Sequence, residues 1–268
     1  MKGDNKIVKA RPLTNNPLTD VAIDIIIPFK NHTAGVSGLL EEIYKFKGIM
    51  YRVHLIDDNS YSKSFIWQYQ SIPWIKVHQF DEDKGFAYCV NHAVKGTENE
   101  INIVLHSDVY NLPLNFMKDM VLGLYQARKD KVSLLSAQTD NPMPKSCSYL
   151  HPEIGIVDSD PYYRILPENE QFVPLICAAF FKSEYGKVGG LPAYPYCWFE
   201  DRLLSDKLRA FGFNLAVSNR VTVRHTGSVT VSKLLQRQPE IKEFLKANKK
   251  SFDNDHAVLQ NYLSKKKV

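Results

Sequence analysis

INIVLHSDVY, Ile101 to Tyr110, is the stretch that decides the fold. Four of its first five residues are apolar, and the apolar run stops at His106, Ser107 and Asp108. A short, nearly continuous apolar run predicts a strand buried on both faces of a sheet. In open α/β sheets, ligands bind beyond the carboxyl ends of the strands. The Ser107 hydroxyl and the Asp108 carboxylate are hard oxygen ligands suited to Mg²⁺ or Mn²⁺, although a simple turn or a helix cap would use the same residues.

Apolar runs alternate with helical patterns on both sides of this stretch. Strands are predicted at Val21–Ile27, where Pro28 would end the strand, and then at Arg52–Ile56, Trp74–Gln79 and from Ile101. Helices are predicted after Pro28, with Val36, Leu39, Leu40, Ile43 and Phe46 on one face, and at Ser64–Gln70, Lys84–Gly96 and Asn115–Arg128. This alternation predicts an α/β fold with a mostly parallel sheet between layers of helices.

Composition places the chain among ordinary globular proteins. It has 268 residues, of which 44% are hydrophobic and 24% charged, enough to build a sizeable core. No apolar run approaches the roughly 18 residues that cross a bilayer, and the N-terminus lacks the apolar segment of a secretory signal. The four cysteines show no CxxC spacing, which disfavours zinc or disulfides. We therefore expect a cytoplasmic protein.

The positive charge is concentrated near the C-terminus. Residues 233–268 carry nine Lys or Arg against four Asp or Glu, which equals the net charge of +5 of the whole chain. We expect residues 1–232 to form one domain and residues 233–268 a basic helical tail packed on it or extending from it. Weak contact of this tail with an anionic membrane surface or with nucleic acid is the alternative.

Six short motifs follow one another along the chain. In order they are PFKN at Pro28, DDNS at Asp57, KGFAYCVNHAVKG at Lys84, HSD at His106, the segment Cys177–Phe213 with its Gly-Gly-Leu turn and aromatic-Glu-Asp sequence, and HTGS at His225. Together they resemble the family-2-like glycosyltransferases with the Rossmann-like GT-A fold, from about Ile23 to Thr230. The resemblance implies an inverting enzyme that moves a sugar from a nucleotide-diphosphate sugar to an acceptor hydroxyl of a glycan, a lipid-linked saccharide or another biopolymer.

The resemblance also implies a metal site. Asp108 matches the last acid of the family's DxD motif, whereas the first position is His106 and the middle one Ser107, so this sequence departs from the motif. Mn²⁺ or Mg²⁺ would neutralise the charge that grows on the leaving diphosphate. His225 is a candidate second ligand, since imidazole binds transition metals; a surface histidine after a strand is the alternative.

Glu200 and Asp201 open a predicted helix and are the candidate catalytic acids. The apolar stripe of this helix consists of Leu203, Leu204, Leu208 and Phe211, and Gly212 lies at the end of the helix. Acids are favoured in a first helical turn for electrostatic reasons alone. The upstream aromatics Tyr196, Trp198 and Phe199, however, provide apolar surroundings that raise the basicity of a carboxylate. By resemblance Asp201 is the general base and Glu200 supports it.

Nucleotide recognition is assigned to the first half of the chain, by the same resemblance. Asp58 matches an acid that binds the base or the ribose, and UDP-sugars are the first expectation for the donor. A solvated turn is the alternative for Asp57 and Asp58, and a solvent-facing helix position for Asn91. The residues expected to bind the nucleotide sugar are Pro28, Phe29, Asn31, Asp57, Asp58, Lys84, Gly85, Asn91 and Ser107.

Two other functions are alternatives. A sugar-phosphate nucleotidyltransferase would carry a Gly-rich loop after the first strand, where this chain reads PFKNHTAG. A catalytically inactive glycosyltransferase-like binding or scaffold protein is favoured by the acid missing at His106, but disfavoured by Glu200, Asp201 and His225.

Overall fold

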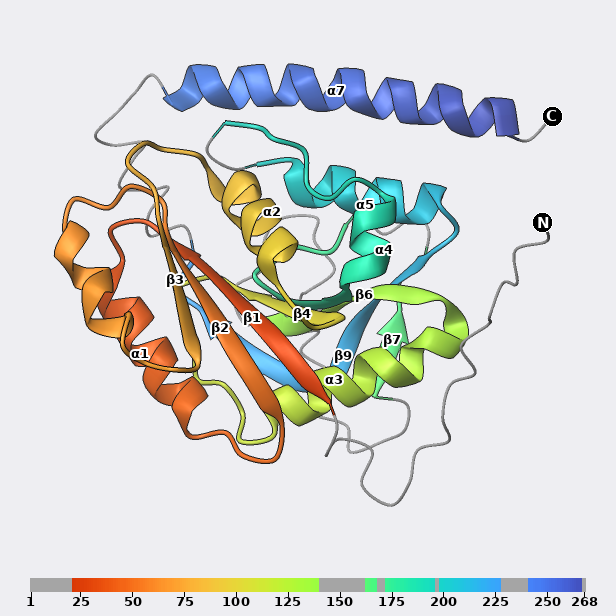
Figure 1. Cartoon of the computed structure of the whole chain (residues 1–268). Helices are drawn as coiled ribbons and strands as arrows, with labels where there is room; N and C mark the ends of the chain where they lie inside the picture. The colour runs from red at the N-terminus through yellow and green to blue at the C-terminus, as the bar shows by residue number, and fades with distance from the viewer. Residues whose placement is uncertain (1–20, 140–161, 168–171, 196–197, 228–240, 267–268) are drawn as a thin grey trace, which may run out of the picture.

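The computed structural model describes residues 21–139, 162–167, 172–195, 198–227 and 241–266. Within them, nine strands form one sheet in the order β3-β2-β1-β4-β8-β6-β9-β5, with β7 paired to β9 off this path (Figure 1). The strands are β1 Ala22–Phe29, β2 Met50–Asp57, β3 Ile75–Gln79, β4 Ile101–Leu105, β5 Val109–Tyr110, β6 Val132–Thr139, β7 Tyr163–Ile165, β8 Cys177–Phe181 and β9 Asn214–His225. The predicted α/β fold class is confirmed.

Helices cover both faces of this sheet. They are α1 Thr33–Tyr44, α2 Phe86–Gly96, α3 Phe116–Ala127, α4 Lys182–Lys187, α5 Glu200–Ala210 and α7 Ile241–Lys266, with 3₁₀ helices η1 Lys63–Tyr69 and η2 Arg128–Asp130. Alternate residues of β1 point to opposite faces: Ile25 joins a hydrophobic cluster with α1 and α3, and Ile26 joins another with α2, α4 and α5. The period-2 alternation of a strand accounts for these two layers.

The sheet is parallel through β3, β2, β1 and β4, as the β-α alternation predicts. All five residues of β4 are buried because this strand lies between β1 and β8 and has helices on both faces. The helical face predicted after Pro28 is also found, with Val36 and Ile43 among the buried residues of α1. The stretch from Ile101 therefore forms the predicted buried strand, and the structure places it between β1 and β8.

The first strand is longer than expected, because it continues through Pro28 to Phe29. Its pairing with β4 ends at Ile26, whereas its pairing with β2 continues to Phe29, opposite Asp57. Pro28 thus lies beyond the part of β1 that is paired on both sides, where a residue without an amide hydrogen is tolerated. The helix predicted at Ser64–Gln70 is the 3₁₀ helix η1, shifted by one residue.

The second half of the sheet is mixed. β8 pairs antiparallel with both β4 and β6, while β9 runs parallel to β6 and antiparallel to β5 and β7. The two-residue strand β5 matters most for the site, because Val109 pairs directly with His225, the last residue of β9. This ladder brings the end of β9 next to the residues that follow β4.

The C-terminal segment forms one continuous helix, α7, which lies along α5 (Figure 1). Its residues Asn248 and Phe252 are almost fully buried, and Lys246, Lys249 and Lys250 are exposed. No helix in the described ranges is long and apolar enough to cross a membrane. The helical tail is therefore confirmed, while the domain division at residue 232 stays a prediction.

Candidate active site

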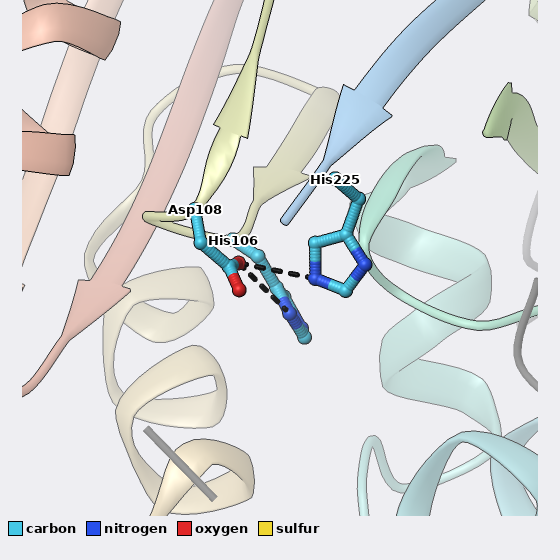
Figure 2. Close-up of side chains that lie close together, drawn as sticks. All are labelled: His106, Asp108 and His225. Carbon is cyan, nitrogen blue, oxygen red and sulfur yellow. Dashed lines mark ion pairs between the residues drawn. The ribbon is translucent and has the colours of Figure 1, made fainter. Parts of the chain in front are cut away.

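His106, Asp108 and His225 converge beyond the carboxyl end of β4 (Figure 2). His225 Nε2 lies 3.1 Å from Asp108 Oδ1, and His106 Nδ1 lies 4.0 Å from the same oxygen. One ligand atom from each residue falls within 4.8 Å of the other two. Two elements supply this triad: the turn after β4 carries the first two residues, and β9 ends on the third.

The protonation states in the triad suit metal binding. Burial alone would raise the pKa of Asp108, but the hydrogen bond from His225 and the neighbouring imidazoles outweigh burial and lower this pKa. Burial lowers the pKa of His106 to about 4, in spite of the nearby Asp108 carboxylate. At neutral pH, His106 is therefore neutral and Asp108 is charged, which are the forms that bind a metal ion.

The donor set fits a divalent cation. One carboxylate and two imidazoles are common ligands of transition metals. Although 30% of the His106 side chain is exposed, its Nε2 is covered by protein and has no hydrogen-bond partner among the described residues. The sequence predicts Asp108 and His225 as ligands, and the structure adds His106, which departs from the acidic motif. Imidazole is itself a metal ligand, so the residue type could have revealed the third member of the triad.

Ser107 belongs to the turn that holds the triad. Its Oγ lies 3.4 Å from His32 Nδ1, just before α1. A Cβ atom at Gly35 would lie 2.5 Å from the Ser107 carbonyl oxygen and would also collide with the His32 ring. The first turn of α1 therefore packs directly on the backbone of the HSD turn, and the absent side chain at Gly35 permits this approach. A contact of Ser107 with a nucleotide sugar stays a prediction.

Glu200 and Asp201 are the first two residues of α5, as predicted. The helix starts from an unusual backbone, because Trp198 (φ +95°) and Phe199 (φ +73°) both adopt positive φ. The Leu175 amide donates to Asp201 Oδ2 (3.2 Å). The other Asp201 oxygen and Glu200 Oε2 are buried without a hydrogen-bond partner among the described residues. Unpaired buried carboxylate oxygens are costly, which makes this helix start a candidate functional site.

Burial raises the pKa of both carboxyls well above the range of ordinary acids. The charge of Asp201 raises the pKa of Glu200 further, and the Leu175 amide partly offsets the effect of burial on Asp201. A carboxylate of raised pKa is a stronger base, which suits it to accept a proton near neutral pH. The aromatic surroundings expected from the sequence include Trp198 and Phe199, while Tyr196 lies outside the described residues.

A two-residue segment joins the acid pair to the triad. Leu175 donates to Asp201, and the next residue, Ile176, accepts a hydrogen bond through its carbonyl from the His106 amide (2.8 Å). The segment continues directly into β8, whose Cys177 pairs with Leu105. The candidate base and the triad are therefore fixed to the same short stretch of backbone.

The residues expected to bind the nucleotide base differ in burial. Pro28 and Phe29 are buried, and the ring of Phe29 packs edge-on against Phe65 (centroids 5.8 Å apart). Asn31 is exposed and has a positive φ of 56°. Its backbone amide donates to Ser60 Oγ (2.8 Å), and its side-chain Oδ1 accepts from the Tyr61 backbone amide (2.8 Å). The loops after β1 and β2 are thus tied together.

Asp57 and Asp58 have different partners. Asp57 is fully buried and accepts from the Ser60 amide (2.8 Å) and from Gln79 (3.2 Å), which stabilises the turn after β2. Asp58 accepts from the amides of Lys84 (2.7 Å) and Gly85 (3.0 Å), where Gly85, at φ +82°, caps α2. Asp58 therefore shapes the Lys84–Gly85 loop, and nucleotide contacts by Asp57, Asp58, Lys84 and Gly85 stay predictions.

Asn91 is oriented toward the second half of the chain. Its Nδ2 donates to the Leu191 carbonyl (2.9 Å), and its Oδ1 accepts from the Tyr185 hydroxyl (2.6 Å) and from the Leu191 amide (3.2 Å). A Cβ atom at Gly190 would lie only 2.6 Å from this Oδ1. Asn91 thus fixes the Gly190–Leu191 turn to α2 and is not the solvent-facing helix residue of the alternative. Its contact with the nucleotide sugar stays a prediction, which these hydrogen bonds do not support.

Replacement of Asp58 tests its part in nucleotide binding. Asp58→Ala removes the acceptor of two backbone amides, so the Lys84–Gly85 loop loses its anchor and any bond to a base or ribose is lost as well. We expect nucleotide affinity to fall by about 1–3 kcal/mol. Calorimetric titration of UDP with Mn²⁺ measures this loss, and Asp81→Asn, at a fully exposed acid, is the control. Unchanged affinity in Asp58→Ala would exclude Asp58 from recognition.

Comparisons with known proteins identify the type of fold. No protein-family model and no curated protein matches the sequence. Among solved structures, this chain is similar to S. aureus TarS 1–349 (17% identity, TM-score 0.57, covering 78% of this chain and 61% of that chain). It is also similar to the mannosyltransferase PcManGT from Pyrobaculum calidifontis with GDP-Man and Mn²⁺ (15%, TM-score 0.59, 93% and 73%) and to GalNAc-T7 with UDP, GalNAc and Mn²⁺ (12%, TM-score 0.55, 76% and 44%).

The protein has a GT-A-like glycosyltransferase fold. The chain spans less than two thirds of the TarS fragment and less than half of the GalNAc-T7 chain. At these identities the likeness concerns the fold, and the activity has to be argued from the site.

Proposed function

We propose that this protein is an inverting glycosyltransferase that transfers a sugar from a nucleotide-diphosphate sugar to an acceptor hydroxyl. One observation carries the proposal. The His106–Asp108–His225 triad and the buried acids Glu200 and Asp201 are attached to the same segment, Leu175–Ile176, at the carboxyl end of β4. A site for a divalent cation and a site for a base are the two requirements of this reaction.

The residues divide the chemistry between them. His106, Asp108 and His225 would hold the cation, which, when bound, neutralises charge on the departing diphosphate. Asp201 accepts the proton of the acceptor hydroxyl as the acceptor oxygen bonds to the anomeric carbon and the bond from that carbon to the diphosphate breaks. Glu200 is the supporting acid: it is buried next to Asp201, and burial and the Asp201 charge both raise its pKa.

The donor is proposed to be a nucleotide-linked hexose or a related sugar, with UDP-sugars as the first expectation. Several neighbours support this class, since solved structures contain GDP-Man in PcManGT and UDP-GlcNAc in TarS. A cytoplasmic location is part of the proposal, supported by the free, buried thiols of Cys89 and Cys177. The choice between Mn²⁺ and Mg²⁺ and the identity of the acceptor are left to experiment.

Thermal unfolding with and without nucleotide tests donor binding. Ligand at 100-fold over its Kd stabilises the folded state by about 2.7 kcal/mol, which raises Tm by about 5–10 °C for a domain of this size. We expect UDP or GDP to produce this shift only when Mn²⁺ or Mg²⁺ is present. If no nucleoside diphosphate shifts Tm in the presence of either cation, the proposed function is wrong.

A catalytically inactive nucleotide-sugar-binding protein is the second candidate. Its main support was the acid missing at His106, and this support is weaker because the His106 ring lies within the triad. Release of nucleoside diphosphate from a nucleotide sugar by slow hydrolysis separates the two. An active enzyme releases it, and Asp201→Asn suppresses the release; a scaffold binds the nucleotide sugar without turnover.

A further inference from the structure

Helix α7 is bonded to the segment that leads into Glu200 and Asp201. Tyr194 donates its hydroxyl hydrogen to Asp255 of α7 (2.7 Å), and Asn248 of α7 donates to the Pro195 carbonyl (2.7 Å). Asn248 is a polar residue with only 1% of its surface exposed. A buried amide in a helix is tolerated when it is hydrogen-bonded, and this one is bonded to the segment just before the acid pair.

Phe252 of α7 covers the strained start of α5. Its ring stacks on the Phe199 ring (centroids 5.4 Å apart, 25° between planes), and the Arg202 guanidinium lies 5.0 Å from its centroid. Phe199 and Trp198 have the positive φ values that residues with side chains adopt only when surrounding contacts hold them. Phe252 is 3% exposed and supplies such a contact to Phe199 from the C-terminal helix.

The same helix also approaches Glu200 through Tyr194. Burial, the hydrogen bond to Asp255, and the charges of Asp255 and Glu200 together raise the pKa of Tyr194, which places the phenol within electrostatic reach of Glu200. Tyr194, Leu203 and Phe252 form a separate hydrophobic cluster against which Phe199 packs. Helix α7 therefore packs on Tyr194 and on Phe199, the residue that directly precedes the acid pair.

We propose that α7 is a positioning element of the active site, which fixes the start of α5 and excludes water from Glu200 and Asp201. The inference rests on the proposed function, because it assumes that these acids act in catalysis. Phe252 and Tyr194 act through Glu200 and Asp201 rather than on a substrate. On this view the C-terminal helix is needed for the reactivity of the acid pair as well as for packing.

Titration of the carboxyl groups by ¹³C NMR tests the proposal without any substrate. Phe252→Leu keeps an apolar side chain but removes the flat ring against Phe199, and Tyr194→Phe removes the bond to Asp255. We expect each to admit water and to lower the higher carboxyl pKa by about one unit or more, because desolvation is the main cause of its rise. Glu200→Gln and Asp201→Asn assign the two signals. Among the ionisable groups around the pair, Tyr185 senses the Asp201 charge and Tyr194 the Glu200 charge, while Arg202 contacts Phe252 and Asp255 bonds to Tyr194.

Tyr262→Leu is the matched control, because Tyr262 of α7 stacks on Phe211 at the opposite end of α5 (centroids 6.5 Å apart). We expect it to leave both carboxyl pKa values unchanged, and Phe252→Tyr to keep the wild-type values. The inference is wrong if Phe252→Leu and Tyr194→Phe titrate like the wild type, or if Tyr262→Leu shifts the pair equally. Either outcome leaves the proposed function intact, because that function is tested separately by the nucleotide-dependent rise in Tm and by the turnover of Asp201→Asn and Glu200→Gln.

Discussion

Replacing Asp201 with Asn is expected to lower turnover by about 10²–10⁴-fold while nucleotide binding stays nearly unchanged. The amide keeps the shape of the side chain and its bond from the Leu175 amide, but it cannot accept the proton of the acceptor. Because burial raises the pKa of Asp201, the wild-type rate should increase with pH through a higher range than an ordinary aspartate gives. Turnover under saturating donor, measured across pH, provides both observations.

Two further variants define the role of Asp201. Asp206→Asn is the matched control, since Asp206 lies on the same helix but pairs with His256 of α7 (3.1 Å). It should leave the pH profile in place. If Glu200→Gln abolishes turnover and Asp201→Asn does not, the two acids exchange roles. If both variants remain active, no base resides at the start of α5 and the inverting mechanism is wrong.

Loss of the Asp108 carboxylate is expected to have a comparable effect on metal binding. Asp108→Ala leaves the imidazoles of His106 and His225 without the carboxylate that lies 3.1 Å from His225. Even residues that only orient a metal ligand contribute about 10–100-fold to affinity, so we expect loss of this ligand to weaken Mn²⁺-dependent binding of UDP by at least about 100-fold. Calorimetric titration with Mn²⁺ measures the change.

His106→Ala decides whether the third residue of the triad takes part. A genuine ligand at this position should weaken Mn²⁺ binding in the same assay, whereas unchanged binding would limit the site to Asp108 and His225. His32→Ala is the control, because His32 lies beside Ser107 on the other side of the HSD turn and outside the triad. Unchanged Mn²⁺ affinity in Asp108→Ala would exclude the metal site altogether.

Features set by local pattern were predictable from the sequence. The buried strand from Ile101 and the apolar face of α1 follow from apolar runs and helical periodicity, which require no knowledge of distant residues. Glu200 and Asp201 were placed at a helix start from the apolar stripe that follows them. Their raised pKa values agree with the aromatic surroundings inferred from residues close by in the sequence.

Features set by distant pairing were not predictable in this way. The short strand β5 has only two residues, too few for a periodic signal, and only the ladder with β9 reveals it. The triad membership of His106 and the bonds of Asn91 to Leu191 likewise depend on segments about 100 residues away. Residue patterns report the local conformation of the chain, whereas contacts between residues distant in sequence depend on how the whole chain folds.

The pairing of Val109 with His225 also constrains the order in which the molecule acquires its metal ligands. The triad joins residues 106 and 108 to residue 225, so no partly folded chain that lacks β9 contains all three ligands. Contacts of such long sequence separation form slowly, because the loop-closure entropy precedes the contacts that offset it. During synthesis, β9 also emerges after most of the sheet. We therefore expect the His106–Asp108–His225 triad to assemble only after β9 has paired with β5.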